Sequence, residues 1–154
     1  MTSHVNMRHS RTKEQSEAME RAKKAGVCPF CHDFCGERLL AFHTKPILKK
    51  TVWWAVTENF EPYSGSKVHI LLVYRGGHAT MPSEISAEGW SDLGHVVEWV
   101  VKEYQLPAGG FFFRFGDTDY TGATISHFHA QIIFGGEKEG ERLRVKLGYT
   151  GAPK

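Results

Sequence analysis

Residues 124–134 (Thr-Ile-Ser-His-Phe-His-Ala-Gln-Ile-Ile-Phe) alternate polar and apolar side chains at their centre, and this pattern constrains the fold more than any other. Successive side chains of a β-strand point to opposite faces, so a strand over residues 125–134 would place His127, His129 and Gln131 on one face. The opposite face would carry Phe128, Ala130 and Ile132. Alternate residues lie about 7 Å apart along a strand, so the three polar groups would line an extended ligand such as a phosphate chain.

Two histidines on one strand face are open to three interpretations. Buried imidazoles cost free energy unless they have partners. The pair is therefore either a set of ordinary, hydrogen-bonded histidines, or a metal-chelating pair, or a place where one histidine acts as nucleophile or base. The third interpretation is favoured, because a fold that keeps a row of imidazoles on one face is expected to use them.

The rest of the chain predicts an α+β domain with a mainly antiparallel sheet and one long helix packed on it. A helix is expected from the capping residue Ser86 to about Gln105. Its apolar stripe is Trp90, Leu93, Val97, Val100 and Tyr104. Further strands are expected at Leu39–Phe42, Thr51–Thr57, Lys67–Arg75, Phe111–Phe115 and Arg142–Tyr149, and Lys49 and Lys50 are expected in a solvated turn. The length of 154 residues fits one domain with a core.

The first 26 residues differ from the others in composition. They hold six Lys or Arg and three Glu, with few apolar side chains. A solvated basic helix over Thr12–Ala25, ended by Gly26, or a flexible arm is expected, with the domain proper at residues 27–154. A role in gripping nucleic acid has weak support, since the formal charge is only +2. No apolar signal segment opens the chain and no apolar run is long enough to span a membrane, so a cytoplasmic protein is expected.

Three cysteines lie within eight residues, and Cys28 and Cys31 have the spacing of a zinc knuckle. An odd number of cysteines in a chain without an export signal favours metal binding over a disulfide framework. A closed tetrahedral site needs two further ligands, and Cys35 and His32 compete for these places.

The segment His127-Phe-His129-Ala-Gln131-Ile-Ile resembles the signature of the histidine triad (HIT) superfamily, with Gln in place of the third histidine. This variant resembles the transferase branch, which includes galactose-1-phosphate uridylyltransferase and the diadenosine tetraphosphate phosphorylases. Other segments agree with the resemblance: Gly122 and Thr124 before the first histidine, Glu58-Asn59-Phe60-Glu61-Pro62, and the strand that leads from Val68 to His78.

The resemblance implies a reaction and a set of residues for it. His129 would be the nucleophile that attacks the α-phosphorus of a nucleotide and forms a covalent nucleotidyl-histidine. Asn59 would hold the ribose, and Gly122 and Thr124 would donate hydrogen bonds to the phosphoryl oxygens. Gln131 would donate a hydrogen bond to a phosphate oxygen but cannot supply a proton. The leaving group should therefore already be good, which modestly favours transfer to phosphate over hydrolysis.

The resemblance also implies a structural zinc ion and a homodimer. His78 and His127 would complete the site of Cys28 and Cys31, and four protein ligands would leave no open position for catalysis. Small members of the family pair through a shared sheet.

The expected function is therefore hydrolysis or nucleotidyl transfer at the α-phosphate of a nucleotide phosphoanhydride, such as a dinucleoside polyphosphate, or of a phosphoramidate. One alternative is deadenylation of nucleic-acid ends, which would use the basic N-terminal segment. The other is a zinc-stabilised nucleotide-binding protein without turnover.

Overall fold

The computed structural model describes residues 3–151. Its centre is a sheet of five strands in the order β1-β2-β3-β5-β4, in which every neighbouring pair is antiparallel. The strands are β1 (Ile47–Lys50), β2 (Trp54–Glu58), β3 (Val68–Tyr74), β4 (Gly110–Phe113) and β5 (His129–Phe134), and the helices are α1 (Lys13–Ala25), α2 (Pro29–Phe34), α3 (Ala87–Glu103) and α4 (Thr118–Thr121). The α+β prediction is confirmed.

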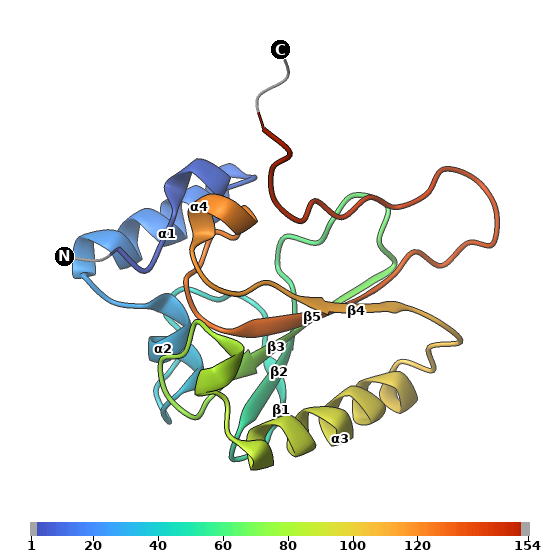
Figure 1. Cartoon of the computed structure of the whole chain (residues 1–154), viewed down its shortest axis with the longest axis horizontal. Helices are drawn as coiled ribbons and strands as arrows, with labels where there is room; N and C mark the ends of the chain where they lie inside the picture. The colour runs from blue at the N-terminus through green and yellow to red at the C-terminus, as the bar shows by residue number, and fades with distance from the viewer. Residues whose placement is uncertain (1–2, 152–154) are drawn as a thin grey trace.

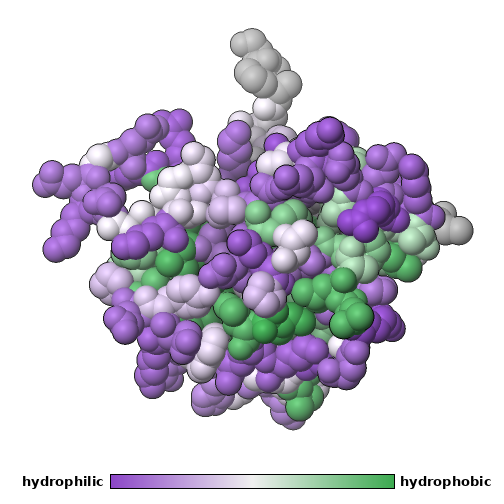
Figure 2. Space-filling model, turned by 180° about the vertical axis from the view of Figure 1, so that it is seen from behind, coloured by the Kyte–Doolittle hydropathy of each residue, from purple (hydrophilic) through white to green (hydrophobic). Residues whose placement is uncertain are grey.

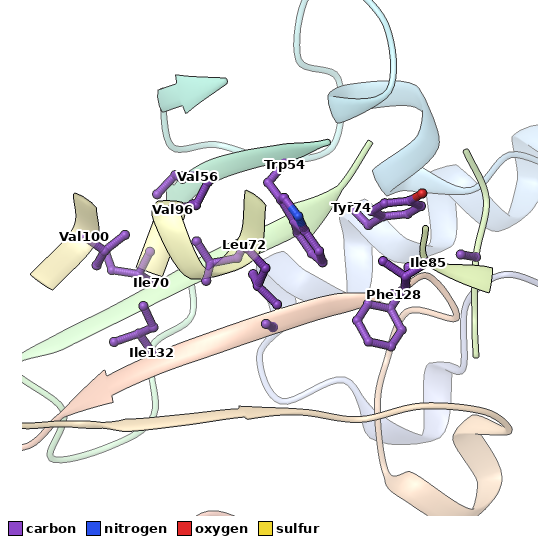
Figure 3. Close-up of a cluster of buried hydrophobic side chains, with 13 residues drawn as sticks. Trp54, Val56, Ile70, Leu72, Tyr74, Ile85, Val96, Val100, Phe128 and Ile132 are labelled. Carbon is purple, nitrogen blue, oxygen red and sulfur yellow. The ribbon is translucent and has the colours of Figure 1, made fainter. Parts of the chain in front are cut away.

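Helix α3 covers one face of the sheet (Figure 1). Ser86 begins it by accepting a hydrogen bond from the Gly89 N–H, 3.0 Å away. The helix buries Leu93, Val96 and Val100 against the sheet. Figure 3 shows how Val96 and Val100 meet Trp54, Ile70, Leu72, Phe128 and Ile132 in one cluster, to which Leu93 also belongs. The expected packing of the apolar face of β5 on this helix is confirmed, and it leaves the other face of β5 free for the site.

The opposite face of the sheet is covered by α1 and α2. Thr12 caps α1 by accepting from the Gln15 N–H, and Gly26 ends it in the left-handed region at φ 68°. Helix α1 buries Ala18, Met19 and Ala22 in a second cluster with Phe30 and Phe34 of α2 and Leu71 and Val73 of β3. The expected helix and its end at Gly26 are confirmed, but the helix is not fully solvated, because one side of it is buried. That side consists mainly of small or single apolar residues among many charges, so the sequence does not show it as a hydrophobic stripe.

Two expected strands are absent from the described residues. The segment 39–42 has no ladder, because the buried carboxylate of Asp33 accepts the backbone N–H groups of Ala41, Phe42 and His43 at 2.7–3.0 Å. The segment 142–149 is also irregular and pairs with no strand of the sheet.

One strand was missed by the sequence analysis. Lys49 and Lys50 lie in β1, at the edge of the sheet, rather than in a turn. Lysine is common on edge strands, since it discourages pairing with other chains. Within residues 3–151, no helix has the length and apolar character needed to cross a bilayer.

Candidate functional site

His129 opens β5 and projects to the face covered by α1 and α2. Its Nδ1 lies 2.7 Å from the backbone carbonyl oxygen of His127, so Nδ1 carries the proton and donates it to that oxygen. Burial lowers the pKa of His129 to about 4, and the nearby positive charge of Arg114 acts in the same direction. The ring is therefore neutral, with an unprotonated Nε2, and it lines a pocket of about 1450 Å³.

Gln131 follows on the same face of β5 and is buried. Its Oε1 lies 2.6 Å from Nε2 of His69, which belongs to the neighbouring strand β3. The other nitrogen of that ring, Nδ1, accepts the backbone N–H of Tyr63 at 3.1 Å. A ring that accepts at Nδ1 must donate at Nε2, so the His69 proton points to Gln131 Oε1. The amide NH₂ of Gln131 is then the end left for a ligand.

His69 remains neutral in this arrangement. Burial lowers the pKa of His69 to about 4, against an opposing effect of its hydrogen bond to Gln131. Sequence analysis gave this histidine no role. One signal in the sequence could have identified His69. It lies two residues before Leu71 in β3, so the two side chains share a face of the sheet, and Leu71 is buried.

The other residues expected to bind substrate also line the pocket. The pocket wall includes Asn59, Gly122 and Thr124 together with His129 and Gln131. Asn59 accepts the Glu61 N–H through Oδ1 at 2.9 Å, which fixes the orientation of its amide. The Thr124 hydroxyl donates to the His9 carbonyl at 3.0 Å. The Gly122 N–H donates to the Thr118 carbonyl at the end of α4. Both groups expected to donate to phosphate are therefore engaged within the protein in this structure.

The pocket has walls that sequence analysis did not identify. The segment before α1 contributes Arg11, the end of β4 contributes Arg114, and the C-terminal segment contributes residues 135–149 in part. The N-terminal segment reaches this place because it pairs with residues 124–126: the Asn6 N–H donates to the Thr124 carbonyl at 2.7 Å and the Ser126 N–H donates to the His4 carbonyl at 2.9 Å. No local pattern in the sequence encodes that pairing.

A second cluster lies beside the pocket and joins α2 to the turn before β5. The ligand atoms of Cys28, Cys31, His78 and His127 all lie within 4.8 Å of one another, as a bound metal ion requires. Cys31 Sγ lies 3.3 Å from Nδ1 of both histidines, and Cys28 Sγ lies 3.5 Å from Nδ1 of His127. His127 precedes β5 rather than belonging to it, unlike the expected strand over 125–134.

The chemistry of this cluster fits a metal ion. His127 donates its Nε2–H to the Tyr74 carbonyl at 2.8 Å, which leaves Nδ1 free to bind a cation. Burial disfavours charge on His127, but hydrogen bonds with Cys31, Cys35 and the Tyr74 carbonyl outweigh it and raise the pKa to about 9. The site thus favours positive charge, and two thiolates with two imidazoles are a usual zinc ligand set.

The two competing ligands have other partners, although Cys35 also hydrogen-bonds with Cys31 and His127. The Cys35 thiol donates to the Tyr74 carbonyl at 3.6 Å, and its hydrogen bond with Cys31 together with burial raises its pKa to about 12, so it stays protonated. His32 places Nδ1 2.8 Å from the Asp33 carboxylate. Neither belongs to the four-residue cluster.

Comparisons with solved structures connect this fold to known proteins, although no protein-family model and no curated protein matches the sequence. A hypothetical protein from Leishmania major superposes with a TM-score of 0.58 and 20% identity, over 84% of this chain and 86% of that chain. A histidine triad nucleotide-binding protein from Candida albicans gives 0.56 and 18%, over 77% and 87%. A diadenosine triphosphate hydrolase from Plasmodium falciparum gives 0.54 and 14%, over 86% of both chains. Together with the His127-Phe-His129-Ala-Gln131 segment, these similarities show that the chain has the fold of the histidine triad proteins.

Proposed function

We propose that this protein is a nucleotide hydrolase or nucleotidyltransferase that acts at the α-phosphate of a nucleotide through a covalent intermediate on His129. The observation that carries the proposal is the contact of His129 Nδ1 with the His127 carbonyl oxygen at 2.7 Å, in a ring that lines the pocket. Because the neutral ring then carries its proton on Nδ1, Nε2 is unprotonated. A neutral imidazole with one nitrogen oriented and the other free is the form required for nucleophilic attack.

In the first step, Nε2 of His129 forms a bond to the α-phosphorus and the bond between that phosphorus and the bridging oxygen breaks. The leaving group departs with the electron pair as an anion. The ring becomes positively charged, and the Nδ1–H bond to the His127 carbonyl stabilises that charge. In the second step, an acceptor oxygen forms a bond to the phosphorus and the bond between phosphorus and Nε2 breaks. The electron pair of that bond returns to Nε2, which restores the neutral ring, and a water acceptor releases its proton to solvent.

Gln131 supports the first step as a hydrogen-bond donor. Its amide oxygen is occupied by His69, so its NH₂ group faces the reacting phosphate. An amide cannot protonate a leaving group, which limits efficient substrates to those whose leaving group is stable as an anion. Phosphoanhydrides meet this condition.

The cluster of Cys28, Cys31, His78 and His127 would hold a zinc ion, which supplies a structural crosslink there and no open coordination position. That crosslink would fix α2 and its Phe30, whose ring meets the His129 ring edge-on at 5.1 Å between centroids. We also propose a homodimer, since β4 is an edge strand whose Phe111 is about half exposed, as is Phe115 just after the strand. Apolar side chains also gather on the reverse face of the molecule (Figure 2).

The acceptor is either water or phosphate. A solved structure of similar fold is a diadenosine triphosphate hydrolase, which supports water. Gln131 supports phosphate, because an intermediate without a neighbouring acid–base group survives longer.

The experiment is a substrate panel with and without inorganic phosphate. Dinucleoside polyphosphates, sugar nucleotides and adenosine phosphoramidates are incubated with the wild-type protein, with His129→Ala, and with the control His95→Ala, which removes an exposed histidine of α3. We expect an adduct of one nucleotide on the wild type by intact mass and a loss of at least about 10³-fold in turnover for His129→Ala only. Equal turnover in the wild type and His129→Ala would contradict the proposal. Nucleotide binding without turnover or adduct would instead support the alternative of a nucleotide-binding protein that is not an enzyme.

A further inference from the structure

We propose that Arg11 and Arg114 form a binding site for the anionic leaving group of the substrate, that is, the phosphates beyond the scissile bond. This inference rests on the proposed function and narrows its substrate class to nucleotide phosphoanhydrides, as opposed to phosphoramidates.

Arg114 follows β4 and projects into the pocket. One terminal nitrogen, Nη2, donates to the Tyr63 hydroxyl at 3.1 Å and to the Lys146 carbonyl. Its Nε is buried without a hydrogen-bond partner. Among the described residues no carboxylate lies within ion-pair distance of Arg114. A buried donor on an unpaired cation costs free energy, and an anion that accepts hydrogen bonds from this guanidinium would reduce that cost.

Arg11 approaches the same tyrosine from the N-terminal segment. Its guanidinium carbon lies 4.4 Å from the centroid of the Tyr63 ring, and its Nη2 donates to the Glu61 carbonyl at 2.6 Å. Within residues 3–151 it too has no carboxylate at ion-pair distance. Tyr63 therefore positions both cations, one over its ring and one at its hydroxyl.

Tyr63 connects the two arginines to the proposed catalytic residues. Its backbone N–H donates to His69, which in turn donates to Gln131, and its ring lies 4.7 Å from the His69 ring. Burial is the main cause of the lowered pKa of His69, and the positive charges of Arg11 and Arg114 lower it further. The two cations thus lie on the side of the pocket to which the Gln131 amide belongs.

Two guanidinium groups at one tyrosine repel each other. Burial is the main cause that lowers the pKa of Arg11, Tyr63 and Glu61 oppose it, and the charge of Arg114 lowers it further. Such an arrangement is stable when a shared anion lies between the cations. Arginine suits phosphate because its planar group donates two parallel hydrogen bonds. Lys138, Arg142, Arg144 and Lys146 also line this pocket, against the carboxylates of Glu137, Glu139 and Glu141.

The leaving group supplies that anion. When His129 displaces a phosphoanhydride, the bridging oxygen keeps the electron pair and the departing phosphate gains one negative charge, with no proton required. The two arginines would stabilise this charge as it develops. A phosphoramidate instead expels an amine, which needs a proton and carries no negative charge, so the same arginines give it no assistance.

The test compares Arg11→Gln, Arg114→Gln and the double variant with the control Arg8→Gln. Arg8 belongs to the same N-terminal segment but is exposed and pairs with Asp119 outside the pocket wall. The substrates are diadenosine triphosphate and adenosine 5′-phosphoramidate, and kcat/KM is measured for each. We expect a loss of tenfold or more per arginine on the phosphoanhydride and less than threefold on the phosphoramidate, with Arg114→Lys partly restoring activity and Arg8→Gln unchanged.

Two outcomes would overturn the proposal. Equal losses of kcat/KM on both substrates would mean that the arginines bind the nucleotide or stabilise the fold, and no loss on either substrate would mean that they have no role. A separate measurement keeps the proposal testable if the protein has no turnover. Inorganic tripolyphosphate should bind to His129→Ala, measured by calorimetry, and its Kd should rise at least tenfold in His129→Ala/Arg114→Gln. Failure of tripolyphosphate to bind would contradict the arginine site, whereas binding without turnover would contradict only the proposed function.

Discussion

Nε2 of His69 lies 2.6 Å from Oε1 of Gln131, across the antiparallel pair β3–β5. Leu71 is the direct partner of Gln131 in that pair, so His69 and Gln131 are diagonal neighbours on one face. The contact engages the oxygen of the Gln131 amide and so leaves its NH₂ group for the pocket. Orientation of the site therefore depends on a residue that does not itself reach the reacting phosphorus.

His69→Phe should leave the fold intact and reduce kcat by about tenfold with a smaller change in KM, because the Gln131 amide would lose its fixed orientation. The double variant His69→Phe/Gln131→Ala should be no slower than Gln131→Ala alone. This double-mutant cycle is measured by steady-state kinetics. Additive losses would show that His69 acts independently of Gln131.

The first chemical step should be insensitive to pH over an unusually wide range. The reactive form of His129 is neutral, and burial lowers its pKa to about 4, so the neutral form persists down to about pH 5. Single-turnover formation of the nucleotidyl intermediate, followed from pH 8 to pH 4.5, should be flat and fall only at the acid end. A limb centred near the ordinary histidine value of about 6.5 would contradict the burial of the ring.

Stability should decrease in acid for a related reason. Burial lowers the pKa of His43 to about 4 in the folded state, below its value in the unfolded chain. The unfolded state therefore takes up protons first, and stability that is fully present above about pH 6.5 is lost as the pH falls toward 4. His43→Gln keeps a partner for Thr57, whose hydroxyl lies 2.7 Å from His43 Nε2.

This variant should flatten the pH dependence of the free energy of unfolding by about 1–3 kcal/mol between pH 6.5 and pH 4.5. Urea titrations at a series of pH values measure the effect. His95→Gln removes an exposed histidine and serves as the control. An unchanged slope in His43→Gln would show that His43 is not the group responsible.

One zinc ion per chain should copurify with the protein and resist dialysis. Cys31→Ser should lose the metal and lower Tm by ten degrees or more, because Cys31 is the thiol that approaches both histidines. Cys35→Ser should keep the metal, since its thiol donates to the Tyr74 carbonyl instead. Metal analysis and thermal unfolding of the two variants separate the cases, and loss of metal from Cys35→Ser alone would reverse the ligand assignment.

The proposed dimer should depend on the edge strand β4. Phe111→Lys places a charge on a half-exposed aromatic position of that edge and should shift the protein from dimer to monomer in sedimentation velocity. Leu39→Lys alters a side chain that is 91% exposed, away from β4, and should have no effect. A wild-type protein that sediments as a monomer at high concentration would contradict the dimer.

The sequence predicted those features that depend on periodicity. Alternation placed His129 and Gln131 on one face of β5, and the stripe of α3 identified its packing side, because both follow from local geometry. Features that depend on contacts between distant segments were not predictable. The backbone N–H groups of Ala41 and Phe42 donate to the carboxylate of Asp33, so they cannot pair with a neighbouring strand. Strand propensities do not include the effect of a carboxylate eight residues away in the sequence. Arg11 reaches the pocket only because Asn6 pairs with Thr124.

His127 belongs to both centres of the molecule, through different atoms. Its ring lies in the four-residue thiol and imidazole cluster, and its backbone carbonyl receives the Nδ1–H of His129. A single residue thus joins the two centres. Loss or replacement of the metal, or oxidation of Cys28 or Cys31, would move His127 and so change the orientation of the His129 ring that its carbonyl holds. Metal content and catalytic rate are therefore expected to rise and fall together, with the ion never touching the substrate.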